Sequence, residues 1–172
     1  MERRFNVIPL IHKTDKGWNF WVARIFYDTV ATIQTGEIGE IGNVDKIKTS
    51  IFRKVDELIE ERKSKKLVEG YKPIENNDLK KLNIVIARKE DHDLGEKWVN
   101  SEIEDELDEI NDDVNDFLMK RGLSFRHHTY LMENGDVILK FFVLDKKLAE
   151  EMILKDFGPR IDKLKQKIEN WS

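Results

Sequence analysis

Apolar residues come in short runs through the first third of the chain, and this pattern predicts strands rather than helices. The stretch 5–12 is apolar on both faces, and a turn composition follows at Thr14-Asp15-Lys16-Gly17. Aromatic and β-branched residues dominate 18–27 and 29–35, with Asp28 at the turn between them, and a further strand is expected at 44–49. The front of the chain therefore predicts an antiparallel β-sheet.

The period changes to 3.6 residues from about Ser50, which predicts one long helix packed on that sheet. Gly70 is expected to end the helix, and the cations before it suit the negative end of the helix dipole. The apolar positions of the expected helix are Ile51, Val55, Leu58, Ile59 and Leu67.

Three glycines, Gly36, Gly39 and Gly42, lie between two expected strands. A phosphate-binding loop needs a helix that opens directly on its glycines, whereas a strand follows here. We therefore expect a tight connection between strands.

The second half begins with a short apolar run at 82–87, expected to be a buried strand, and continues with a helix over 101–121. Ser101 and Glu104 form a capping-box pattern at its start, and Gly122 is expected to end it. One face of this helix is apolar: Val99, Ile103, Leu107, Ile110, Val114, Phe117 and Leu118.

Asn134-Gly135 between extended runs at 124–132 and 136–144 predicts a hairpin whose second strand is central in its sheet. His127 and His128 would then point to opposite faces of a strand and would not share a site. Asp145 is expected to cap a helix that reaches Lys155, and Phe157-Gly158-Pro159 to break it before a last helix. The second half thus reads as a β-α-β-β-α(α) unit with helices on one face of an antiparallel sheet, which makes the whole chain α+β.

Charge separates the two halves. Residues 1–82 contain 16 Lys and Arg against 13 Asp and Glu, whereas residues 83–172 contain 14 against 21. A loop composition at 72–78 falls between them. We predict a first domain at 1–74, a linker at 75–82 and an acidic α+β domain at 83–172.

The chain has no cysteine, which excludes disulfides and thiolate chemistry and favours a reducing compartment. No apolar run is long enough for a signal-peptide core or a membrane span. We therefore expect a cytoplasmic protein without a membrane partner.

Thirteen acids against one lysine, Lys97, lie between Glu90 and Asp116. Such a density is relieved by solvent, by a basic partner protein or by an intramolecular contact with the basic first half. The candidates for partner binding are Glu102, Asp105, Glu106, Asp108, Glu109, Asp112, Asp113 and Asp116. Two groups offer possible metal ligands, Asp91-His92-Asp93 and the same-face helix acids Glu106, Glu109 and Asp113. Metal binding is not expected, because the helix acids lie opposite the apolar stripe instead of facing inward.

The first unit resembles a WGR domain over about residues 3–74. The matching features are Arg3-Arg4-Phe5 at the start, Phe20-Trp21 in the second strand, Thr32 to Gly36 leading into Ile38-Gly39, Lys46 and Lys48 before the helix, and Leu67 to Tyr71 at the end. The resemblance implies association with nucleic acid or with a nucleoprotein machine. The second half resembles no family that we recognise.

The Trp-Gly-Arg tripeptide that names the family is replaced by Thr35-Gly36-Glu37. Glu37 would place like charge opposite phosphate, so DNA binding through that position is not expected. The remaining candidates for nucleic-acid binding are Arg3, Arg4, Lys46, Lys48, Arg62, Lys63, Lys65 and Lys66.

The chain contains none of the nucleophile-elbow, zincin or Walker motifs, and we expect no cofactor and no catalysis. Three hypotheses stay open at this point. The first is a binding protein whose WGR-like unit associates with nucleic acid, the second an adaptor or inhibitor that acts through the acidic helix 99–121, and the third a small-ligand enzyme.

Overall fold

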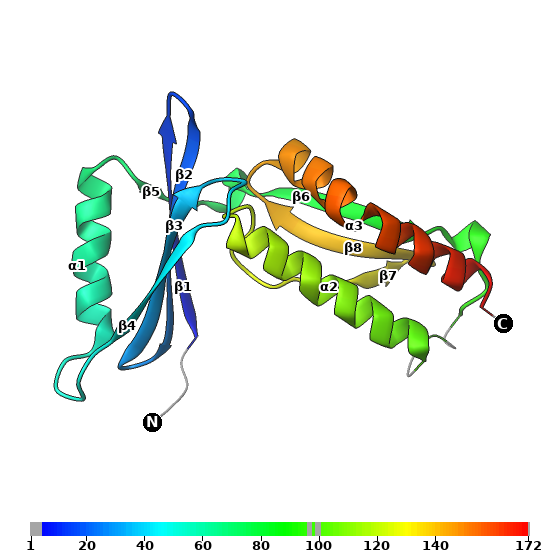
Figure 1. Cartoon of the computed structure of the whole chain (residues 1–172), viewed down its shortest axis with the longest axis horizontal. Coiled ribbons are helices and arrows are strands. Elements are labelled where there is room, and N and C mark those ends of the chain that lie inside the picture. The colour runs from blue at the N-terminus through cyan, green and yellow to red at the C-terminus, as the bar shows by residue number, and fades with distance from the viewer. Residues whose placement is uncertain (1–4, 96–97, 99–100, 172) are drawn as a thin grey trace. The chain divides into compact units, whose positions relative to one another are not determined.

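The computed structural model describes residues 5–95, 98 and 101–171. The chain is α+β and divides into two compact units. The first consists of Met1–Asp78 with Lys120–Phe125, and the second of Leu79–Met119 with Arg126–Ser172. Figure 1 labels the elements of both units.

The first unit contains a five-stranded antiparallel sheet in the order β4-β3-β2-β1-β5. Four of its strands were expected from the sequence, and the two-residue β5 was not. The strands are β1 (Asn6–Thr14), β2 (Gly17–Tyr27), β3 (Val30–Glu37), β4 (Asn43–Lys48) and β5 (Lys72–Pro73).

One face of this sheet packs against α1 (Val55–Val68). Because side chains alternate along a strand, each strand sends every second residue to this face. The buried cluster on it consists of Leu10, Trp21, Ala23, Ile25, Ala31, Ile33, Ile47, Val55 and Ile59. The predicted arrangement of an antiparallel sheet with one long helix is confirmed.

Helix α1 starts five residues later than the apolar period predicted. The Val55 amide donates to the Asp28 carbonyl over 2.7 Å, which ties the first turn of the helix to the turn between β2 and β3. Ile51, expected on the buried face, lies in the preceding loop and is 78% exposed. At the other end, Gly70 (φ +102°) ends the helix as predicted, since the amides of Gly70 and Tyr71 donate back to the carbonyls of Leu67 and Lys66.

The glycine segment between β3 and β4 is the predicted tight connection. The amides of Gly39 and Gly42 donate to the carbonyls of Arg121 and Lys120, each over 2.9 Å, and Lys120–Phe125 belongs to the same unit. These amides therefore bind the protein's own backbone rather than an anion.

The second unit contains a three-stranded antiparallel sheet in the order β6-β8-β7. Its strands are β6 (Lys80–Ala87), β7 (Leu131–Glu133) and β8 (Asp136–Val143). The predicted Asn134-Gly135 hairpin is present, and β8 is the central strand as expected. Two short 3-10 turns, Asn76–Asp78 and Lys89–Asp91, flank β6.

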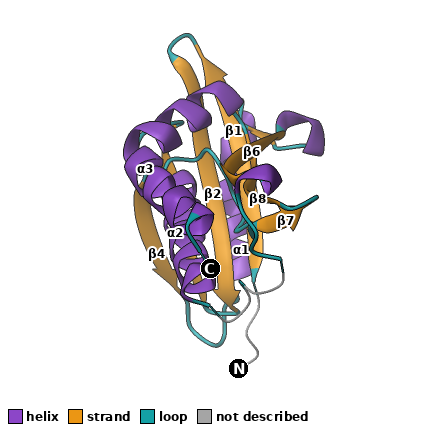
Figure 2. Cartoon of the chain, turned by 90° about the vertical axis from the view of Figure 1, so that its right-hand side faces the viewer, coloured by secondary structure: helices purple, strands orange, loops and turns teal. Residues whose placement is uncertain are grey.

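The helices α2 (Glu102–Lys120) and α3 (Lys146–Glu169) run side by side in Figures 1 and 2. They cover one face of the small sheet: Leu82, Ile84 and Ile86 of β6 are buried, whereas the alternate residues Lys81 and Asn83 are exposed. The Ser101 hydroxyl accepts the Glu104 amide, as the capping-box pattern predicted. Val99, expected on the apolar face of α2, lies outside the described residues.

Three details differ from the sequence-based expectation. The strand expected at 124–132 is reduced to β7, and β6 begins at Lys80, inside the segment expected to be a linker. α3 continues through Pro159 instead of breaking there. Its buried stripe, with Ile153, Phe157 and Ile161, runs across the proline, so packing on both sides outweighs the missing backbone hydrogen bond.

Candidate functional site

The acids of α2 find their first partners on α3. Arg160 donates to Asp113 over 2.8 Å, and Lys167 lies 2.7 Å from Glu102 and also bonds Glu106. Because acids later in α2 pair with cations earlier in α3, the two helices are antiparallel. Hydrogen bonds to Glu102 and Glu106 raise the pKa of Lys167 above its ordinary value.

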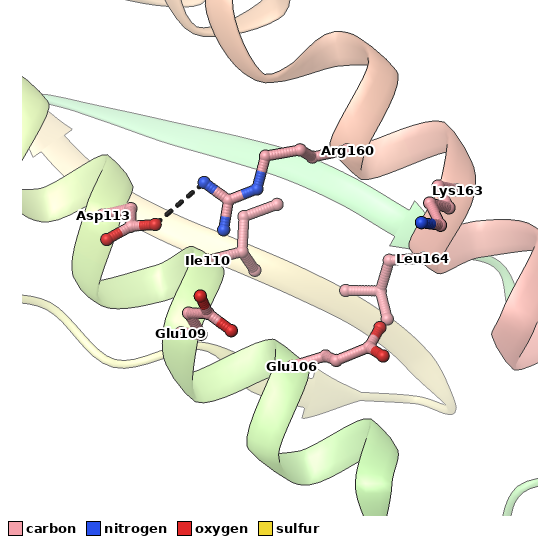
Figure 3. A pocket seen from close by; sticks show the side chains of 7 residues that line it. All are labelled: Glu106, Glu109, Ile110, Asp113, Arg160, Lys163 and Leu164. Carbon is pink, nitrogen blue, oxygen red and sulfur yellow. Dashed lines mark hydrogen bonds and ion pairs between the residues drawn. The ribbon is translucent and has the colours of Figure 1, made fainter.

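A groove of about 330 Å³ lies between the two helices. In Figure 3, Glu106, Glu109 and Asp113 form its α2 side, and Arg160 and Lys163 its α3 side. Ile110 and Leu164, both buried, form the floor. The groove thus has one acidic wall, one basic wall and an apolar base.

Glu109 and Lys163 are the charges of this groove that no ion pair joins to another described residue. The Asp113–Arg160 pair lies on one side of them along the helices, and Lys167 with its two glutamates lies on the other. These ion pairs therefore flank Glu109 and Lys163 on both sides along the groove.

The opposite flank of α2 meets the segment that leads into β7. The Asp108 carboxylate and the Tyr130 hydroxyl form a hydrogen bond, and burial followed by this bond raises the pKa of Tyr130 well above its ordinary value. Asp112 lies 2.9 Å from the Nε2 atom of His127. Asp105 and Asp116 point away from both flanks: they are exposed, and no ion pair joins them to the described residues.

Sequence reasoning missed the cations of α3. It considered the first half of the chain as the intramolecular counter-charge for the acids, whereas the observed ion pairs come from the second unit itself. Arg160, Lys163 and Lys167 have the three- and four-residue spacing of one helix face, and this signal was present in the sequence.

The predicted nucleic-acid candidates among the described residues lie on two elements of the first unit, β4 and α1. Lys46 and Lys48 are exposed on β4 and point to the sheet face opposite α1, because Ile47 between them is buried against the helix. The remaining described candidates, Arg62, Lys63, Lys65 and Lys66, lie in the second half of α1. Arg3 and Arg4 lie outside the described residues.

Two of the α1 cations already have partners. Lys65 lies 3.6 Å from Glu61, and Lys66 lies 2.9 Å from Glu69 with its ammonium 5.1 Å from the ring centre of Tyr71. These contacts are typical of an exposed helix end and contribute little individually.

His92 makes structural contacts beside the hairpin. His92 bonds the Gly135 carbonyl through Nε2 over 2.8 Å and accepts the Leu94 amide at Nδ1, which orders the loop beside the hairpin. The described residues contain no group of three or more His, Asp or Glu side chains placed to hold a metal ion. The groove lining contains carboxylates, a guanidinium and an ammonium, but no hydroxyl, thiol or imidazole.

Comparison with protein-family models, with curated proteins and with solved structures gave no match. Among the described residues, no helix combines the length and the apolar character needed to cross a bilayer.

Proposed function

We propose that this protein is a non-catalytic, cytoplasmic binding protein whose second unit holds a partner protein along α2. The observation that carries the proposal is the α2–α3 groove, in which no ion pair joins Glu109 of the acidic wall or Lys163 of the basic wall to another described residue. Burial of Ile110 and Leu164 between the helices fixes the floor of the groove, so a ligand meets a preformed surface and less conformational entropy is lost on binding.

The chemistry of α2 favours a partner segment rich in lysine or arginine. Glu109 extends the exposed acids Asp105 and Asp116 along the helix, and these three carboxylates have no counter-charge among the described residues. A basic segment would neutralise them, with its acidic or polar positions turned toward Lys163. Such complementarity raises the association rate and makes binding sensitive to salt.

The test uses the full chain and a fluorescein-labelled octalysine peptide, followed by anisotropy at low salt. The double variant Asp105→Lys with Glu109→Lys is expected to weaken binding at least about tenfold, because the probe then meets like charge. The matched control reverses Glu150 and Glu151, two exposed acids of α3 outside the groove, and is expected to bind nearly as the unmodified chain does. If both double variants lost the same affinity for the peptide, the effect would come from net charge alone, and the proposal would be wrong.

A second candidate function is the one that the WGR resemblance implies, association of the first unit with nucleic acid. Lys46 and Lys48 favour it, because both are exposed on the same strand face and no ion pair joins them to the described residues. Charge reversal at these two lysines is expected to weaken binding to a 16-base-pair duplex and to lower its salt dependence. Charge reversal at Lys65 and Lys66 is the matched control, because both lysines already pair with acids. If charge reversal at Lys46 and Lys48 left the affinity for the duplex unchanged, this candidate function would be wrong.

A further inference from the structure

The small sheet of the second unit has a face that neither α2 nor α3 covers. Phe141 and Val143 of β8 are fully buried toward the helices, whereas Phe142 between them points the other way and is 37% exposed. The neighbouring strand adds Lys81 opposite Phe142, and Asn83 opposite Lys140. Side chains that lie directly opposite each other on adjacent antiparallel strands are in contact range.

Two lysines and a histidine lie next to Phe142. The Lys140 ammonium lies 5.8 Å from the ring centre, and the His128 ring centre lies 5.4 Å from it. Lys81 completes the group through the cross-strand pair. An exposed aromatic ring therefore lies at the centre of a positively charged part of the sheet.

The positive charges near Phe142 also act on His128. The pKa of His128 is held below its ordinary value, first by burial and then by the positive charges of His127, Arg126 and Lys140. The acids of the hairpin, Glu133 and Asp136, lie opposite each other in the register of β7 and β8, at the other end of β8 from Phe142. The Asp136 carboxylate accepts a hydrogen bond from the Lys89 amide and forms an ion pair with Arg88.

We propose that this sheet face binds single-stranded nucleic acid, with one base stacked on Phe142 and the flanking phosphates held by Lys81 and Lys140. Bases of a single strand are free to stack on an aromatic ring, whereas those of a duplex are already stacked on each other. A protein ligand fits this face less well, because lysine is depleted from the centres of protein interfaces and the neighbours of Phe142 are polar. The site is separate from the α2–α3 groove, which lies on the helical side of the same unit.

The test measures the anisotropy of fluorescein-labelled 12-nucleotide oligouridylate and oligothymidylate with the full chain, with a labelled 12-base-pair duplex in parallel. Phe142→Ala is expected to weaken single-strand binding about 5- to 150-fold, the range that stacking of one base on an aromatic residue supports. Phe142→Trp is expected to keep the affinity, since it keeps the stacking surface. Both substitutions are at an exposed position, and circular dichroism confirms that the fold persists.

The phosphate contacts have their own readout. Lys81→Gln and Lys140→Gln are each expected to lower the slope of log affinity against log salt by about 0.7, the value for one phosphate contact on a single strand. Lys155→Gln removes the same charge from an exposed position of α3 and is expected to leave the slope unchanged. Single-strand binding is also expected to survive charge reversal at Lys46 and Lys48, which separates this site from the first unit.

Three results would overturn the proposal. The first is an absence of single-strand binding at low salt, and the second is an affinity that Phe142→Ala leaves unchanged. The third is displacement of the oligonucleotide by an octaglutamate peptide that itself binds tightly and loses affinity with Phe142→Ala, which would make the face a site for acidic protein segments.

Discussion

The side chain of Asn115 bonds both backbone groups of His128: its Nδ2 donates to the carbonyl and its Oδ1 accepts the amide, each over 2.8 Å. Asn111, one turn earlier on α2, donates to the same carbonyl over 2.9 Å. The backbone at His128 therefore satisfies its hydrogen bonds on α2 instead of on β8. This explains why the strand expected from residue 124 begins only at Leu131.

Replacing Asn115 by Leu is expected to destabilise the second unit by about 1–3 kcal/mol, because the His128 amide would lose its partner and the His128 carbonyl would keep only Asn111. Urea unfolding followed by circular dichroism measures the change. The control is Asp116→Asn, an exposed neighbour expected to stay within about 0.5 kcal/mol. A neutral Asn115→Leu variant would show that these two bonds do not hold the segment.

Gly122→Ala is expected to destabilise the first unit by more than about 2 kcal/mol. Gly122 has a φ of +65°, and an added Cβ would lie 2.2 Å from the Phe20 ring, which is fully buried in the same unit. Amide hydrogen exchange at Val22 and Ala23 reports on this unit alone.

Gly158→Ala is the matched control for that change. Gly158 lies inside α3, where an added Cβ meets no atom within 4 Å apart from its chain neighbours and the backbone of its own helix. The helix propensity of alanine favours the substitution and the ring of the following Pro159 opposes it, so stability is expected to change by less than about 1 kcal/mol. If both alanines had the same effect, the steric explanation for Gly122 would fail.

The stability of the second unit is expected to fall as the pH is lowered from about 7.5 to 5.5, because the pKa of His128 is lower in the folded chain than its ordinary value. As the pH falls, the unfolded chain takes up a proton on His128 before the folded chain does. The stability that the neutral His128 provides is therefore complete above the unfolded pKa and is lost as the pH falls through that pKa toward the folded one. His128→Gln is expected to flatten this part of the profile. An NMR titration of the His128 ring that gave an ordinary or raised pKa would contradict the assignment.

Pro159→Ala is expected to stabilise α3 by about 1–3 kcal/mol, since proline inside a helix removes one backbone hydrogen bond and crowds the carbonyl four residues earlier. The shift of the urea midpoint measures this gain, with the exposed Lys155→Ala as a neighbouring control within about 0.5 kcal/mol. A loss of stability would instead mean that the packing of Phe157 and Ile161 depends on the proline.

Local chemistry made several elements predictable. These elements depend on interactions over a few residues, and they appear where the sequence placed them. They are the Asn134-Gly135 turn, the capping serine of α2, and the glycines that end α1 and α2. The start of α1 was not predictable in this way, because it depends on the Asp28 carbonyl of another turn. The continuity of α3 likewise depends on burial against the sheet, which outweighs the local preference of proline.

The same distinction between local and tertiary interactions applies to the candidate sites. The acids of α2 and the apolar stripe opposite them follow from the sequence, because a helix has a known period. Only the tertiary structure decided that Asp113 meets Arg160, that Lys163 and Glu109 line the same groove, and that Phe142 lies beside Lys140 and Lys81 on the sheet face away from the helices. Periodicity determines which residues lie on the same face of one helix or strand. Which residues of another element they contact depends on how elements distant in sequence pack together.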